Sequence, residues 1–152
     1  TYDGRPELPK IGQVIQSEAK KANIDVKLRN VDDIEGYLKD KDAWDASMYS
    51  YLTVPRGDTG YFFNTAYLPK GANNKGNYNN KEVTQQIKQL NQTFGQPERE
   101  QLTNQILKTS DKDIPNSYIT YNDQIDGVSK NVKNFNVTPE SIYLIDYKVD
   151  KK

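Results

Sequence analysis

WDASMYSY, residues 44–51, runs directly into LTVPRGDTGYFFN, residues 52–64, and this junction decides the fold. The first segment is short and rich in aromatic residues, which favours a strand in the middle of a sheet. The second opens a region with many Pro, Gly and Asn residues, so residues 52–80 are expected to be mostly loop, with one aromatic turn at residues 61–63. Long loops inside a compact domain are usually functional. We therefore expect a ligand site where this strand ends, as in open α/β sheets.

Helix and strand patterns alternate before this junction. Apolar side chains recur at helical spacing over residues 9–22, and apolar and polar residues alternate strictly over residues 24–30. Asp32 and Asp33 then mark the acidic start of a short helix that ends near Lys41. The order helix, strand, helix, strand predicts an α/β fold.

Two more helices and several short strands are predicted after the loop. Helical spacing covers residues 81–94 and 97–110, and these two helices should pair as a hairpin. Strand-like segments separated by Asn, Asp and Pro follow, the last of them at residues 135–137 and 142–145. We therefore predict a mixed sheet flanked by helices, with strands near residues 24–30, 44–51, 115–121 and 125–129.

The composition limits the classes of function. The chain has 152 residues, enough for one domain, and its 21 basic and 21 acidic side chains give no net charge. No cluster of Lys or Arg is dense enough to follow a nucleic-acid backbone or an anionic membrane. Cys and His are both absent, which excludes disulfides, thiolate or imidazole metal sites and triads with a histidine base. A globular binding module is the favoured class.

Sequence patterns for catalysis and for phosphate or calcium binding are weak or missing. Asp32, Asp33, Asp111 and Asp113 are candidates for paired carboxylates by residue type alone, and we interpret them as acids at helix ends. The glycines of residues 52–64 match neither a P-loop nor a dinucleotide fingerprint. No Asp-rich calcium loop is present. We therefore expect no enzymatic activity.

The junction region instead gathers hydrogen-bond donors and aromatic faces. Arg56 is the strongest candidate for ligand binding, because it lies on a loop between Pro55 and Gly57 and its planar guanidinium can bind a carboxylate through two parallel hydrogen bonds. Two other interpretations stay open: Arg56 as a surface cation paired with Asp58, and the tyrosines as core residues, which is the role we expect for Trp44, Phe62 and Phe63. The predicted ligand-binding residues, with no metal ligand among them, are Tyr49, Tyr51, Arg56, Asp58, Tyr61 and Asn64.

Several short motifs, taken in order, resemble one protein family. They are RPELP at residues 5–9, IDV at 24–26, WDA at 44–46, IPNSY at 114–118 and VSKNVKNF at 128–135. Their order resembles the second lobe of the large solute-binding proteins of oligopeptide and nickel ABC importers, together with the segment that returns from it to the first lobe. Residues 49–64 look most like the staphylococcal members, which import metal bound to an opine metallophore or to histidine.

The resemblance implies a fold and a domain organisation. Proteins of this family are much longer and bind ligand between two lobes that close on a hinge. The chain is then expected to be a C-terminal fragment with a type II periplasmic-binding-protein-like lobe. Residues 1–114 would be part of the second lobe, and residues 115–152 the hinge and the segment that returns toward the absent first lobe. An apolar face uncovered by the truncation would favour self-association.

The resemblance also implies a function. The protein would be the solute-binding component of an ABC importer, lipid-anchored at the extracellular face of the membrane, and would deliver its ligand to the permease. Because the chain has no His to coordinate nickel, the metal is expected only within a chelate whose carboxylate Arg56 clamps, while Tyr49, Tyr51 and Asn64 hydrogen-bond or wall it. No resident cofactor is implied. The alternatives are an oligopeptide-binding protein of a peptide importer, a structural module and a carboxylate-using enzyme.

Overall fold

The computed structural model describes residues 1–121, 123, 125–135 and 150–151, and only the backbone of Arg56, Asp150 and Lys151. Its helices are α1 (Glu7–Lys21), α2 (Ile34–Tyr37), α3 (Gly60–Ala66), α4 (Lys81–Gln92) and α5 (Gln96–Ser110), with one 3-10 turn, η1 (Pro55–Gly57). The strands β1 (Val132–Lys133) and β2 (Asp150–Lys151) pair antiparallel. None of the described helices is long and apolar enough to cross a bilayer.

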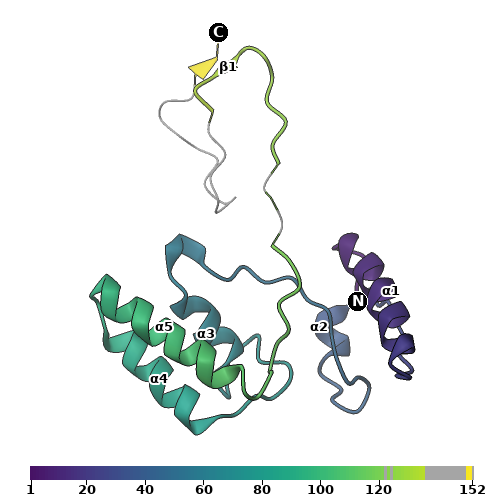
Figure 1. Cartoon of the computed structure of the whole chain (residues 1–152). Coiled ribbons are helices and arrows are strands. Elements are labelled where there is room, and N and C mark those ends of the chain that lie inside the picture. Colours follow the sequence, from purple (N-terminus) through teal and green to yellow (C-terminus); the bar gives the residue numbers. More distant parts are fainter. Residues whose placement is uncertain (122, 124, 136–149, 152) are drawn as a thin grey trace.

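Helices α3, α4 and α5 share the larger apolar core (Figure 1). Val83, Ile87 and Leu90 recur at helical spacing on α4, and all three are inaccessible to solvent, as is Ile106 on α5. The side chain of Asn80 caps α4 by accepting two backbone N–H groups of its first turn. The predicted helical hairpin is thereby confirmed, and each helix end lies within two residues of its predicted position.

Helix α3 occupies the residues predicted to form an aromatic turn within a loop. Phe62, Phe63, Ala66 and Tyr67 are all buried, and their i, i+1, i+4, i+5 spacing is that of one helix face. The rings of Phe62 and Tyr67 meet edge to face with centroids 5.3 Å apart. The turn prediction is wrong because burial of this face in the core decides the local structure, in spite of the flanking glycines.

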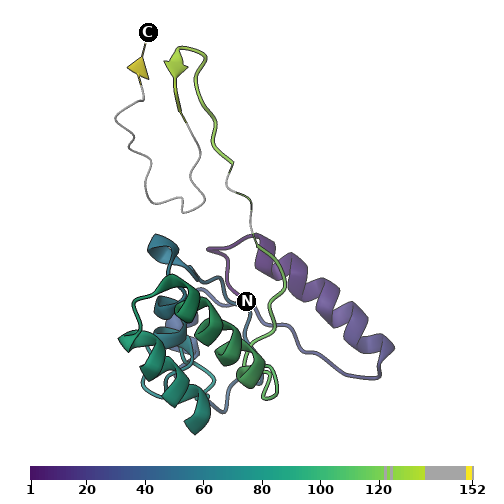
Figure 2. The same ribbon diagram turned by 60° about the vertical axis from the view of Figure 1, so that its left-hand side comes forward.

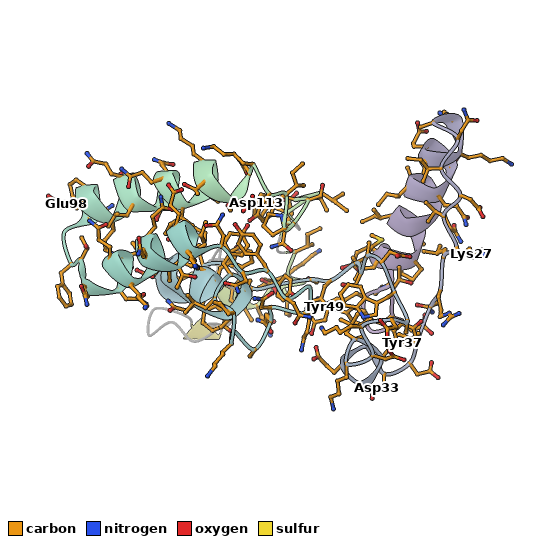
Figure 3. The ribbon with its side chains drawn as sticks, turned by 90° about the horizontal axis from the view of Figure 1, so that it is seen from below. Lys27, Asp33, Tyr37, Tyr49, Glu98 and Asp113 are labelled. Atoms are coloured by element: carbon orange, nitrogen blue, oxygen red, sulfur yellow. The ribbon has the colours of Figure 1, made fainter. Side chains whose placement is uncertain are left out.

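The N-terminal part of the chain packs around α1 and α2, on the other side of the molecule from α3–α5 (Figures 1 and 3). Its buried apolar residues are Leu8 of α1, Ile34 of α2 and Leu38. The predicted helix at residues 9–22 is confirmed as α1. The next helix is shorter than predicted, since α2 ends at Tyr37 rather than near residue 41. Asp33 caps α2 by accepting the backbone N–H of Gly36.

The predicted mixed sheet is not observed among the described residues. Within them, residues 24–30, 44–51, 115–121 and 125–129 form no ladder, and besides β1 and β2 the described pairing is one parallel bridge between Tyr2 and Val31. Alternating polarity predicts which side chains face a core, but a strand also needs a neighbouring strand for its N–H and C=O groups. The segment predicted at 142–145 and most of 135–137 lie outside the described residues.

After α5 the chain leaves the helical core (Figures 1 and 2). Tyr118 stays close to the core, with its hydroxyl 2.6 Å from that of Tyr67. Residues 125–135 then run away from the helices to β1 (Figure 2). The domain division at residue 114 stays a prediction.

Candidate functional site

Two tyrosines of the predicted site lie side by side between the two groups of helices. The rings of Tyr49 and Tyr51 stack with centroids 4.7 Å apart, and Figure 3 labels Tyr49. The Tyr49 hydroxyl donates to Glu35 of α2, and the Tyr51 hydroxyl donates to the backbone carbonyl of Asn73 at 3.1 Å. Tyr51 also meets Phe62 edge-on, with ring centroids 6.1 Å apart. The pair therefore forms an aromatic bridge from α2 to the core of α3–α5.

Both phenols of this bridge are neutral hydrogen-bond donors at ordinary pH. The hydrogen bond to Glu35 raises the pKa of Tyr49, and burial raises the pKa of Tyr51 to about 12. Glu35 also accepts from the Lys75 ammonium at 2.6 Å, and the hydrogen bonds from Lys75 and Tyr49 lower the pKa of its carboxyl group. This end of the site thus presents one carboxylate, one ammonium and two neutral rings.

Asp58 fastens the predicted ligand loop to α5. One of its carboxylate oxygens, Oδ1, accepts the backbone N–H of Gly60 at 2.6 Å, and the other, Oδ2, accepts from the guanidinium of Arg99. Its immediate neighbour also contacts α5, because the hydroxyls of Thr59 and Thr103 lie 3.0 Å apart. The described partner of Asp58 is therefore Arg99, 41 residues further along the chain, while the predicted alternative of a pair with Arg56 involves a side chain outside the described part of the structure.

Asn64 fastens the loop to α4. It exchanges two amide hydrogen bonds with Asn91, at 2.9 and 2.8 Å, and it also donates to the backbone carbonyl of Gly60 at 2.7 Å. Both ends of the Asn64 side chain are thus engaged by the protein itself. A direct contact between Asn64 and a ligand stays a prediction, whereas its support of α3 is described.

Arg56 and Tyr61 are placed differently from the anchored residues. The backbone of Arg56 lies in η1, and Gly57 has φ of 72°, a left-handed conformation that glycine adopts without strain. The side chain of Arg56 lies outside the described part of the structure, so its contact with a carboxylate stays a prediction. Tyr61 is 48% exposed, which makes it the most accessible of the three predicted tyrosines.

Four residues that organise this region are not among those predicted from the sequence: Glu35, Lys75, Asn91 and Arg99. Their partners in the site lie 14 to 41 residues away, so no local spacing reveals the pairs. The predicted helical hairpin was the one available signal, because it brings residues 91 and 99 close to the same turn. Within the described residues, no three acidic side chains lie close enough to hold a metal ion.

Comparison with known proteins gives close matches for nearly the whole chain, although no protein-family model matches the sequence. The nickel-binding protein NikA of Staphylococcus aureus is 64% identical over 148 residues, which are 97% of this chain and 30% of that protein. The crystal structure of NikA from Staphylococcus aureus in complex with Ni(L-His)2 matches with a TM-score of 0.86 at 62% identity, over 99% of this chain and 32% of that one. A structure described as a nickel ABC transporter from Bacillus halodurans matches with a TM-score of 0.78 at 36% identity, over 98% of this chain and 32% of that one.

These matches test the resemblance drawn from the motifs. The chain spans only 30% to 32% of the length of the relatives that it matches. Over that part its fold is that of nickel-binding proteins, even though the regular structure of the described residues is mainly helix, with little sheet. The names of these relatives refer to nickel binding and to transport, and none of them names an enzymatic activity. The resemblance is therefore confirmed: over nearly its whole length, the chain is similar to part of the solute-binding proteins of nickel ABC transporters.

Proposed function

We propose that this chain forms part of a solute-binding protein that captures nickel as a complex with a small chelator and delivers it to an ABC permease. The observation that carries the proposal is its 62% identity, over 99% of the chain, to a NikA protein solved in complex with Ni(L-His)2. The chain contains neither His nor Cys, so it offers nickel no imidazole or thiolate ligand of its own, which favours a metal that arrives bound to a chelator. The protein would work at the extracellular face of the membrane, anchored there by lipid, and would catalyse no reaction.

The 49–64 region is the proposed contact surface for the chelate. Arg56 would bind a chelator carboxylate through its planar fork, and the exposed ring of Tyr61 would wall the ligand. The hydroxyls of Tyr49 and Tyr51 are already engaged by other parts of the chain, so we propose that these two residues offer ring surface rather than hydrogen bonds. Asp58 and Asn64 would act by holding the loop, since their polar atoms are bonded to Arg99 and Asn91.

Histidine is the chelator that the similarity supports, because the match was solved with Ni(L-His)2. An opine metallophore carries carboxylates of the same kind and would use the same cation, Arg56. An oligopeptide remains the second candidate ligand within the family. Self-association of the chain is a separate proposal. A titration distinguishes the three ligands.

The first test is an amide NMR titration of the chain with nickel plus L-histidine, nickel plus an opine metallophore, nickel alone and a tetrapeptide pool. We expect shifts clustered at residues 49–64 with the chelates only. Shifts with the peptides only would replace the proposal by oligopeptide binding, and the absence of shifts with every chelate would refute chelate binding by this chain. Nickel alone reports direct coordination, which we do not expect.

Arg56→Ala tests the proposed contact. Removal of a charge-assisted, bidentate hydrogen bond should weaken binding by about tenfold or more. Arg5→Ala is the matched control, because Arg5 is exposed just before α1 and loses the same charge. Equal affinity of Arg56→Ala and Arg5→Ala for the nickel–histidine complex would remove Arg56 from the site.

A further inference from the structure

We propose that Arg99 is a positioning residue of the ligand site, which fixes the loop carrying Arg56 against the turn between α4 and α5. This inference rests on the proposed function of that loop. Arg99 acts through Asp58 and does not itself touch the ligand. Its guanidinium makes three described hydrogen bonds, to the backbone carbonyls of Leu90 at 2.7 Å and Thr93 at 2.6 Å, and to the Asp58 carboxylate.

The location of Arg99 on its own helix points to a tertiary role. Arg99 lies in the first turn of α5, where the positive end of the helix dipole disfavours a cation. Its guanidinium instead reaches the C-terminal end of α4, where it donates to the carbonyls of Leu90 and Thr93 and the negative end of the helix dipole favours a cation. Only 23% of the side chain is exposed. Arg99 is therefore held by the helical hairpin, and the hairpin in turn presents a fixed charge to Asp58.

The contact between Asp58 and Arg99 is closely packed. Asp58 uses its second oxygen to accept the N–H of Gly60, which starts α3. A Cβ at position 60 would lie 2.6 Å from that oxygen and 3.5 Å from the Arg99 guanidinium. A side chain at position 60 would therefore displace the Asp58 carboxylate from its present contact with the Gly60 N–H. A shift of the loop at Asp58 would break the hydrogen bond to the Gly60 N–H or the ion pair with Arg99.

This anchor defines the position of Arg56, because Arg56 precedes Asp58 by two residues. The intervening Gly57 has φ of 72°, and its N–H donates to the carbonyl of Val54 at 3.0 Å, which closes the 3-10 turn. Pro55 restricts the backbone on the other side. With the turn closed and Asp58 fixed, few backbone positions are left to Arg56. Contacts of this kind hold a binding group to within a fraction of an ångström of the position that its ligand needs.

Hydrogen exchange of the chain tests the positioning role without any ligand. In Arg99→Met, we expect the Gly60 amide to exchange about tenfold faster, because the loss of a charge-assisted bond lets Asp58 move away from it. The amides of Ile87 and Ile106 should keep their protection, which shows that the core is intact. Lys108→Met is the matched control: Lys108 is exposed in the last turn of α5, so the variant removes a positive charge from the same helix far from Asp58, and the exchange of the Gly60 amide should not change. Unchanged exchange at Gly60 in Arg99→Met would overturn the inference.

Affinity for nickel plus L-histidine then tests whether Arg99 acts through Arg56. Arg99→Met should weaken binding in the parent chain, and should cause no further loss when Arg56 is already Ala. Arg99→Lys should restore little, since an ammonium cannot reach the three acceptors that the planar fork bonds. Equal losses in both backgrounds would mean that Arg99 acts independently of Arg56, which also overturns the inference. If the parent chain binds no chelate, the proposed function fails, and hydrogen exchange at Gly60 alone decides whether Arg99 positions the loop.

Discussion

Replacement of Asn74 by alanine should destabilise the loop between α3 and α4, which supports the Tyr51 side of the candidate site. Asn74 is only 9% exposed, and its amide group makes three hydrogen bonds to the backbone. Nδ2 donates to the carbonyls of Leu68 and Tyr78 at 2.9 and 2.8 Å, and Oδ1 accepts the N–H of Tyr78 at 2.8 Å. One side chain thus closes the whole turn.

The size of the effect follows from these bonds. Each hydrogen bond contributes about 1 kcal/mol net, and the partly buried backbone groups left behind are hydrated only in part. The free energy of unfolding should therefore fall by about 3 kcal/mol in Asn74→Ala. Asn74→Asp should cost at least as much at neutral pH, because a carboxylate would face the two carbonyl oxygens that the amide now bonds. Asn73 lies in the same turn and accepts from Tyr51, so the bridge of stacked tyrosines should loosen as well.

Urea denaturation followed by circular dichroism measures this loss. The midpoint should decrease while the slope stays the same, since the surface exposed on unfolding is unchanged. Asn79→Ala is the control, because Asn79 is exposed in the same loop and its loss should matter by less than about 0.5 kcal/mol. If the two variants lose the same small amount, water replaces the three bonds and the loop does not depend on Asn74.

Two further predictions concern backbone strain and pH. Ile114 has φ of 49°, a left-handed conformation that is strained for isoleucine, and its side chain is 72% exposed. Ile114→Asn should therefore relieve about 1 kcal/mol of backbone strain and raise the melting temperature by about 3 °C. Ile119→Asn in the same segment is the control and should leave the melting temperature unchanged. The pKa of Glu35 is lowered by its hydrogen bonds from Lys75 and Tyr49. The stability it contributes is therefore present above the ordinary glutamate pKa and is lost as the pH falls through the lowered one. The Glu35→Gln variant should not show this loss of stability when it is unfolded by acid. If its acid unfolding curve is the same as that of the parent chain, Glu35 contributes nothing to the stability.

The helices of the hairpin could be predicted because their information is local. Val83, Ile87 and Leu90 follow one another at the period of a helix, and Asn80 stands at the cap position. Helix α3 also carried such a pattern in Phe62, Phe63, Ala66 and Tyr67, but glycines on both sides favoured a turn. Intrinsic propensity is a weak guide where four side chains of one face enter the core.

The sheet and the site depend on information that is not local. Residues 24–30 alternate in polarity as a strand should, yet the described chain provides them with no neighbouring strand. The anchors of the loop, Arg99 and Asn91, lie 41 and 27 residues from Asp58 and Asn64. On the sequence they are ordinary polar positions of exposed helix faces. The sequence therefore predicts the region of the proposed site, whereas the partners that hold this region follow only from the fold.

The way in which the loop is held has a consequence for binding. The core of α3–α5 is apolar and includes Phe62 and Phe63, whereas the loop just before α3 is fastened to α5 by polar links, from Asp58 to Arg99 and from Thr59 to Thr103. Links of this kind, partly exposed, contribute about 1 kcal/mol each, so the loop can open at a much smaller free-energy cost than global unfolding. The apparent affinity then falls in proportion to the closed fraction of the loop. Substitutions in these polar links should therefore weaken ligand binding before they measurably lower the stability of the helical core.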